Sequence, residues 1–211
     1  LYLTGLTIGG NIATNNGGGV YLTNGSRMEA SSGEIGSAGN GNQAALGAGM
    51  YVLSSTVEFD GNIFNNVASN NGGGVYAAAS TLYLTDAQVG GTGVNEANRI
   101  GASGLNGGGL YLTLGTHATL QNTVVSSNTL TNPTTGYGGG LYVRDSSVVT
   151  LTNSRVERHV LPSTFDGRGA GIYVSSSTVT LDNSAVLSNT AGDLGGGIRV
   201  YAGGTLNIIN G

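Results

Sequence analysis

Hydrophobic residues in this chain follow short runs of strict alternation, and each run ends at Gly, Ser, Asn or Asp. The segment 172–181 is representative, because Ile172, Val174, Val179 and Leu181 alternate with Tyr or with hydroxyl side chains. A period of two places the aliphatic residues on one face of a β-strand. No stretch keeps the 3.6-residue period of a helix, so the pattern predicts an all-β protein of many short strands.

One short phrase returns along the whole chain: two small residues, a Gly, an aliphatic residue and then, in six of seven cases, Tyr. The phrase ends at Tyr21, Tyr51, Tyr76, Tyr111, Tyr142, Tyr173 and Arg199, at separations of 30, 25, 35, 31, 31 and 26 residues. Self-similarity at such a period is typical of a solenoid, in which each repeat buries its apolar face only by stacking on its neighbours.

Two further apolar columns recur with the same period. The second strand of each repeat carries Leu3, Ala30, Phe59, Leu84, Leu120, Leu151, Leu181 and Ile208, and the third carries Ile8, Ile35, Phe64, Val89, Val125, Val156 and Val186. Three short strands per coil, stacked at about 4.8 Å, give a parallel β-helix. Because the coils vary from about 25 to 36 residues instead of keeping a strict hexapeptide rhythm, we predict the right-handed form, with about 7 to 8 coils.

Residues 1–211 are interpreted as a single β-helix segment. The first residues already fit a strand and the last follow one, and neither end carries a polar cap or a covering helix. Solenoids need such caps. We therefore expect a fragment of a longer solenoid, or ends that associate with another chain.

Composition narrows the possible partners. The chain has 40 Gly but only two Pro and no Gly-X-Y period, which excludes collagen. Only 9% of residues are charged, there is no Lys, and the net charge is −4. This composition disfavours nucleic acid as a binding partner. No apolar run is long enough to span a membrane. With no Cys and no Lys-Ser/Thr after the Gly-rich turns, we expect no metal and no cofactor.

The recurring Tyr column is the first candidate for function. Alternation places Tyr21, Tyr51, Tyr76, Tyr111, Tyr142 and Tyr173 outside the coils, one above another. Stacked rings at strand spacing stabilise a solenoid by covering its backbone and one another, which is the structural interpretation. The functional alternative is a strip on which sugar rings stack.

A second candidate is the concentration of charge in residues 144–168. Adjacent coils could bring Asp145, His159, Asp166 and Arg168 together, and a carboxylate with a basic partner is what proton abstraction from a uronic acid needs. The simpler interpretation is a solvated patch of surface ion pairs.

The corner after the second strand is interpreted as structural. Asn recurs there at Asn122, Asn153, Asn183 and Asn210. Asn tolerates the left-handed backbone conformation, and its amide can bond to the same position in adjacent coils.

The segments 11–21 and 67–76, which contain Asn-Gly-Gly-Gly-Val-Tyr, resemble the repeats of polymorphic outer membrane proteins within the pectate-lyase-like β-helix superfamily. The resemblance covers essentially the whole chain. It implies an extracellular or bacterial cell-surface passenger, adhesin or appendage subunit, whose partners would be glycans or other surface proteins.

Two functions follow from these expectations. The first is a non-catalytic structural or adhesive solenoid of a surface or secreted protein. The second is a carbohydrate-binding or polysaccharide-degrading β-helix protein. The Asn-Thr-Asp, Gly-His-Gly and Arg-Ile-Lys signatures of the superfamily's enzymes are absent, so we expect no catalytic activity. Fold alone does not decide between the two functions.

Overall fold

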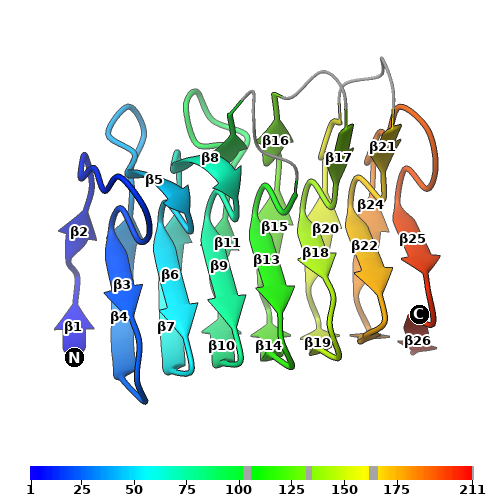
Figure 1. Cartoon of the computed structure of the whole chain (residues 1–211), viewed down its shortest axis with the longest axis horizontal. Helices are drawn as coiled ribbons and strands as arrows, with labels where there is room; N and C mark the ends of the chain where they lie inside the picture. Colours follow the sequence, from blue (N-terminus) through cyan, green and yellow to red (C-terminus); the bar gives the residue numbers. More distant parts are fainter. Residues whose placement is uncertain (102–105, 132–134, 162–165, 211) are drawn as a thin grey trace.

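The computed structural model describes residues 1–101, 106–131, 135–161 and 166–210. The chain winds into coils of short strands that stack side by side along one axis (Figure 1). Every strand pair recorded for these residues is parallel, and no α-helix occurs among them. The predicted parallel β-helix is therefore confirmed.

The repeated Gly-aliphatic-Tyr phrase forms the first face of the solenoid. Among the described residues, its seven-stranded sheet consists of β3 (Val20–Leu22), β6 (Met50–Leu53), β9 (Val75–Ala78), β13 (Leu110–Thr113), β18 (Leu141–Val143), β22 (Ile172–Ser175) and β25 (Ile198–Tyr201). The register pairs Tyr with Tyr and aliphatic with aliphatic from coil to coil, except that Tyr173 pairs with Arg199 in the last coil.

The second face follows a short turn. Its strands are β1 (Tyr2–Thr4), β10 (Thr81–Thr85), β14 (His117–Gln121), β19 (Val148–Thr152), β23 (Thr178–Asp182) and β26 (Thr205–Ile209), together with the first halves of β4 (Arg27–Ile35) and β7 (Thr56–Ile63). The third face has β2 (Thr7–Ile8), β11 (Gln88–Val89), β15 (Val124–Ser126), β20 (Arg155–Glu157) and β24 (Ala185–Leu187). Because β4 and β7 continue through the corner, the two faces join into one sheet.

The return loops contain short strands that the alternation did not predict. They are β5 (Gln43–Leu46), β8 (Val67–Asn71), β12 (Arg99–Ile100), β16 (Thr129–Leu130), β17 (Thr135–Tyr137) and β21 (Asp166–Arg168). Four of them form a sheet in the order β16-β12-β8-β5, and β17 pairs with β21. They enclose a small second core of Ala68, Ile100, Leu130 and their neighbours.

The main core consists of aliphatic ladders from the first three faces. Met28, Leu82, Leu120 and Leu151 have essentially no exposed surface. Each fully buried aliphatic side chain contributes roughly 1.5–3 kcal/mol before the entropy cost is counted. A single coil cannot build this core, so its stability comes from stacking.

One predicted core position is wrong by one residue. Ile63, not Phe64, pairs with Val89 in the third column. The reason is local: β7 passes through the corner with Gly61 at φ 141°, and the register between β4 and β7 shifts at that point. β4 advances from Ala30 to Gly33 while β7 advances only from Phe59 to Gly61, so β7 passes the corner with one residue fewer and the residues after Gly61 lie one position earlier than the repeat predicts.

Glycine is required at the start of each first face by two separate constraints. The first Gly of each phrase, as at Gly107, has a positive φ of 57–68°. The third Gly lies against the next coil: a Cβ on Gly109 would be 2.7 Å from the carbonyl oxygen of Gly140. Only a residue without a side chain fits both places without strain.

We expect Gly109→Ala to lower the free energy of unfolding by about 1–3 kcal/mol, because the added methyl overlaps the backbone of the next coil. Gly197 occupies the same column, but the nearest atom to its Cβ would be 3.6 Å away, so Gly197→Ala is the matched control and should change stability by less than about 0.5 kcal/mol. Urea unfolding measures both. Equal effects would contradict the stacking constraint.

Candidate functional site

The interior contains a ladder of asparagines that the sequence analysis did not identify. In most coils the side-chain oxygen accepts from the backbone N–H of the preceding member, and the side-chain nitrogen donates to a carbonyl of the preceding coil. Asn98 shows the pattern, since its Oδ1 accepts from Asn66 N at 3.1 Å and its Nδ2 donates to Ile63 O at 2.7 Å. The inner asparagine ladder consists of Asn42, Asn66, Asn98, Asn128, His159 and Asn189.

His159 occupies one position of this ladder, and its assignment to a surface patch is wrong. Its side chain is fully buried. Its Nδ1 accepts from Asn128 N at 3.0 Å, and its Nε2 lies 3.1 Å from the carbonyl oxygen of Val125. These are the acceptor and donor roles of Asn in other coils, so the network assigns the neutral tautomer with its proton on Nε2. Burial lowers the pKa of His159 to about 4.

The corner column adopts the expected backbone conformation but forms fewer mutual bonds than a continuous ladder. Asn122, Asn153, Asn183 and Asn210 all have φ between 46° and 51°. The Nδ2 of Asn183 donates to Asn153 Oδ1 at 2.7 Å. Asn122 and Asn210 instead donate to the carboxylates of Asp86 and Asp182, at 2.9 Å each.

The predicted tyrosine strip forms a ladder in which the rings stack on one another. Ring centroids of consecutive members from Tyr21 to Tyr173 are 4.9–5.2 Å apart. Tyr51, Tyr111, Tyr142 and Tyr173 are buried, while Tyr21 is 55% exposed. Desolvation raises the pKa of Tyr76 and of Tyr142 to about 12. Stacked faces are engaged with each other, so this geometry stabilises the solenoid and leaves little ring surface for a sugar.

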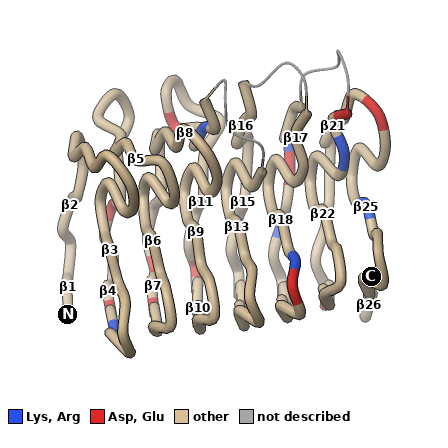
Figure 2. Tube along the Cα trace, viewed as in Figure 1, with Lys and Arg blue, Asp and Glu red and all other residues tan. Residues whose placement is uncertain are grey.

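The four proposed acid–base residues do not converge. Asp145 pairs with Arg144 at 2.7 Å and accepts from Thr113 Oγ1, in the turn between β18 and β19. Arg168 pairs with Asp166 at 3.0 Å and with Asp193 at 2.6 Å, on the return-loop side. Figure 2 shows these charges at opposite ends of the coils. With His159 inside, the residues occupy three separate places.

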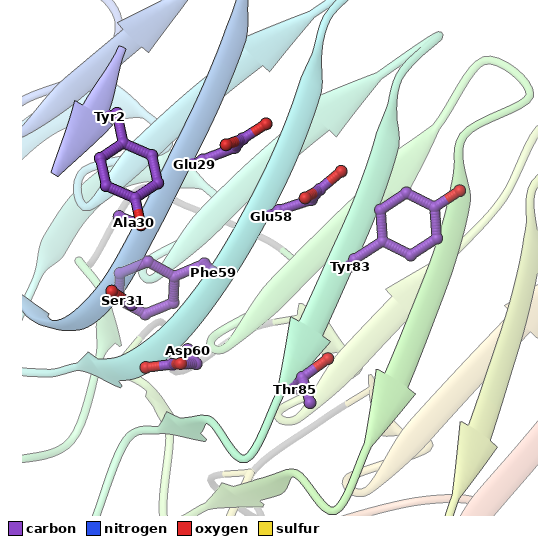
Figure 3. Close-up of a pocket in the computed structure, with 9 residues that line it drawn as sticks. All are labelled: Tyr2, Glu29, Ala30, Ser31, Glu58, Phe59, Asp60, Tyr83 and Thr85. Atoms are coloured by element: carbon purple, nitrogen blue, oxygen red, sulfur yellow. The ribbon is translucent and has the colours of Figure 1, made fainter. Parts of the chain in front are cut away.

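A different surface has the features of a binding site. The second face is hollowed over β1, β4, β7 and β10, with a volume of about 470 Å³. We call it the acidic groove. It is lined by Tyr2, Glu29, Ala30, Ser31, Glu58, Phe59, Asp60, Tyr83 and Thr85 (Figure 3). Ala30 and Phe59 belong to the buried apolar column beneath the groove. The other lining residues could be identified in the sequence as outward residues of the second strand, where Tyr, Glu and Asp replace the Thr of later coils.

The register places the groove residues in one row across four strands. Tyr2 pairs with Glu29, Glu29 with Glu58, and Glu58 with Tyr83. Like charges opposite each other on adjacent strands are destabilising. Arg27 offsets this, because its Nε contacts Glu29 at 2.6 Å and its Nη2 contacts Glu58 at 2.7 Å.

Hydrogen-bond acceptors and two exposed rings are the chemistry that the groove offers. Asp60 already accepts from the backbone N–H of Ser32 at 2.5 Å.

No group of three or more His, Cys, Asp or Glu side chains within the described ranges is arranged to hold a metal ion. Likewise, the described part of the chain has no helix long and apolar enough to cross a membrane.

Stacked parallel strands, glycine turns and side-chain ladders define the class as a parallel β-solenoid. The model of the right-handed β-helix region matches residues 7–211, and the chain belongs to this family. The predicted right-handed form is thereby confirmed. Comparison with curated proteins found no match, and comparison with solved structures found none either.

Removal of one inner asparagine should be costly. We expect Asn98→Ala to lower the free energy of unfolding by about 2–4 kcal/mol, because it leaves Asn66 without its acceptor and the Ile63 carbonyl without its donor. Asn207→Ala is the control, since Asn207 is exposed and forms one bond of 3.3 Å to Thr180. Urea denaturation measures the free energy of unfolding of both variants. Equal losses in Asn98→Ala and Asn207→Ala would refute the structural role of the ladder.

His159 should make the solenoid sensitive to acid. Its folded pKa of about 4 lies below the usual value of 6.5, so its contribution to stability is complete above pH 6.5 and is lost as the pH falls towards 4. Between pH 7 and pH 5 the parent chain should lose roughly 2 kcal/mol more than His159→Asn, which restores the residue of the other coils. Unfolding curves at both pH values measure this difference. Parallel pH profiles would show that His159 is not buried as a neutral ring.

Proposed function

We propose that this chain is a non-catalytic structural or adhesive solenoid segment of a bacterial cell-surface or secreted protein. The observation that carries the proposal is the continuity of its ladders. Tyrosine, asparagine and aliphatic columns run from coil to coil with almost no interruption. Such stacking produces a stiff rod, which suits a stalk or a passenger that presents a surface.

The placement of charge supports the non-catalytic part of the proposal. The ion pairs of Arg144 and Arg168 are partly exposed and belong to separate faces. Exposed pairs of this kind contribute only about 0–1 kcal/mol each and typically solubilise a surface. A catalytic acid and base would need to lie within hydrogen-bond reach of one substrate.

The extracellular location and the adhesin-like role rest on the resemblance to polymorphic outer membrane protein repeats. A surface of Thr, Ser and Asn with few charges suits this role. Its partners would be glycans or other surface proteins, and association through the end coils belongs to the same proposal.

Carbohydrate binding is the second candidate function, and the acidic groove is the observation that favours it. Tyr2 and Tyr83 are 73% and 44% exposed at the two ends of the carboxylate row. Aromatic rings combine an apolar face with a polar rim, as sugar-binding surfaces require. The hollow between them is wide enough for a ligand and open to solvent.

A polysaccharide panel separates these functions. We expect no turnover, and we expect any glycan binding to weaken about tenfold in Tyr83→Ala, which corresponds to about 1.4 kcal/mol. Tyr201→Ala is the control, since Tyr201 is 54% exposed but lies outside the groove. Affinity electrophoresis measures binding, and release of reducing or unsaturated ends measures turnover.

Each result is decisive for one part of the proposal. Turnover by the parent chain would overturn the non-catalytic assignment. Binding that depends on Tyr83 but not on Tyr201 would establish the groove as a carbohydrate site. Absence of both binding and turnover would reject the second candidate and leave the structural role.

A further inference from the structure

The residues of the acidic groove form a row with a definite orientation. The row runs from Tyr2 to Tyr83 across three strand intervals, which is about 14 Å at the spacing of a β-sheet. The row therefore lies along the axis of the solenoid. An extended chain of a few pyranose rings fits the length of the row, whereas a single small molecule would occupy only part of it.

The ends of the row provide stacking surfaces that the tyrosine ladder does not. Figure 3 shows Tyr2 and Tyr83 on either side of Glu29 and Glu58. Tyr2 and Tyr83 occupy equivalent positions of the second strand in their coils, so both rings project from the same face of the sheet. A ligand that bridges the two rings would lie over the carboxylates.

The groove is rich in acceptors and carries excess negative charge. Ionised carboxylates only accept hydrogen bonds, so Glu29, Glu58 and Asp60 suit a ligand that presents many hydroxyl donors. Arg27 supplies one positive charge against these three, and it is already engaged by both glutamates. An anionic ligand would meet two uncompensated negative charges, and such repulsion is an effective means of specificity.

We propose that the acidic groove binds uncharged sugar chains and rejects polysaccharides that carry carboxylate or sulfate groups. This inference rests on the carbohydrate-binding function proposed above and adds the class of ligand. The two tyrosines hold the chain by stacking, and the carboxylates accept from its hydroxyl groups while they exclude acidic sugars.

The test compares uncharged and acidic hexasaccharides by isothermal titration calorimetry. The probes are cellohexaose, xylohexaose, mannohexaose and hexagalacturonate, and the variant is the triple substitution Glu29→Gln, Glu58→Gln and Asp60→Asn. We expect the parent chain to bind at least one neutral hexasaccharide and to bind hexagalacturonate at least tenfold more weakly. The triple variant should bind hexagalacturonate at least tenfold more tightly than the parent does.

Two controls keep the result interpretable. Glu34→Gln removes a carboxylate from the following face of β4 and should leave the discrimination unchanged. Circular dichroism and the urea midpoint establish that the triple variant is folded. If its midpoint falls, the single substitution Glu58→Gln, at a side chain 42% exposed, replaces it, with a smaller gain expected in the same direction.

The outcomes separate this inference from the function on which it rests. Equal binding of hexagalacturonate and a neutral hexasaccharide would overturn the charge selectivity and leave carbohydrate binding intact. Binding of none of the four probes would overturn both. Binding of hexaarginine in place of the sugars would identify the groove as a site for a basic peptide and would also overturn the proposal.

Discussion

The whole structure depends on one constraint, which is the stacking of equivalent positions. Each residue lies about 4.8 Å from the residue at the same position in each adjacent coil. A side chain that faces the interior or covers the backbone is therefore tolerated only if it packs against its own kind or against a close mimic. This accounts for glycine where backbones approach, as at Gly109 and Gly140, and for rings that stack face to face. It also accounts for His159, which fits because its two nitrogens reproduce the acceptor and donor of asparagine.

The same constraint distinguishes structural columns from variable surfaces. Columns that face the interior or cover the backbone remain nearly uniform, because one misfit would disturb two neighbouring coils. Outward positions of the second face are free of this restriction, and there the residues change from Tyr and Glu near the N-terminus to Thr in later coils. The acidic groove arises from this freedom, on a scaffold that holds its residues in fixed register.

Much of the fold could be predicted from the sequence, because residue types that recur once per coil are the ones that stack on one another in the structure. The Tyr column and the alternating Leu column gave the correct strands and the correct register. The position of Phe64 is one residue off because β7 passes the corner at Gly61 with one residue fewer than β4, a backbone feature with no distinct sequence signal. The inner ladder does have a sequence signal, which is an aliphatic residue three positions before Asn or His, as in Ile63–Asn66 and Val156–His159. Loops of variable length obscure this spacing in other coils.

The candidate site was predictable only in part. Charge density suggested residues 144–168, but density along the chain does not show which face a side chain occupies, and Asp145, His159 and Arg168 lie in three places. The groove, in contrast, requires the register of four strands, which brings Tyr2 and Tyr83 into one row although 81 positions separate them in the sequence.

Deletion of one complete coil tests the central claim most directly. Removal of residues 141–171 joins Gly140 to Ile172, which preserves the repeated phrase. It also removes His159, so that Asn128 and Asn189 become neighbours in the inner asparagine ladder. If the coils are equivalent stacked units, the shortened chain should keep the β-sheet circular dichroism spectrum and unfold cooperatively in urea, with a modestly lower midpoint. An unfolded or aggregated product would contradict the account, because it would show that this coil is not an exchangeable layer.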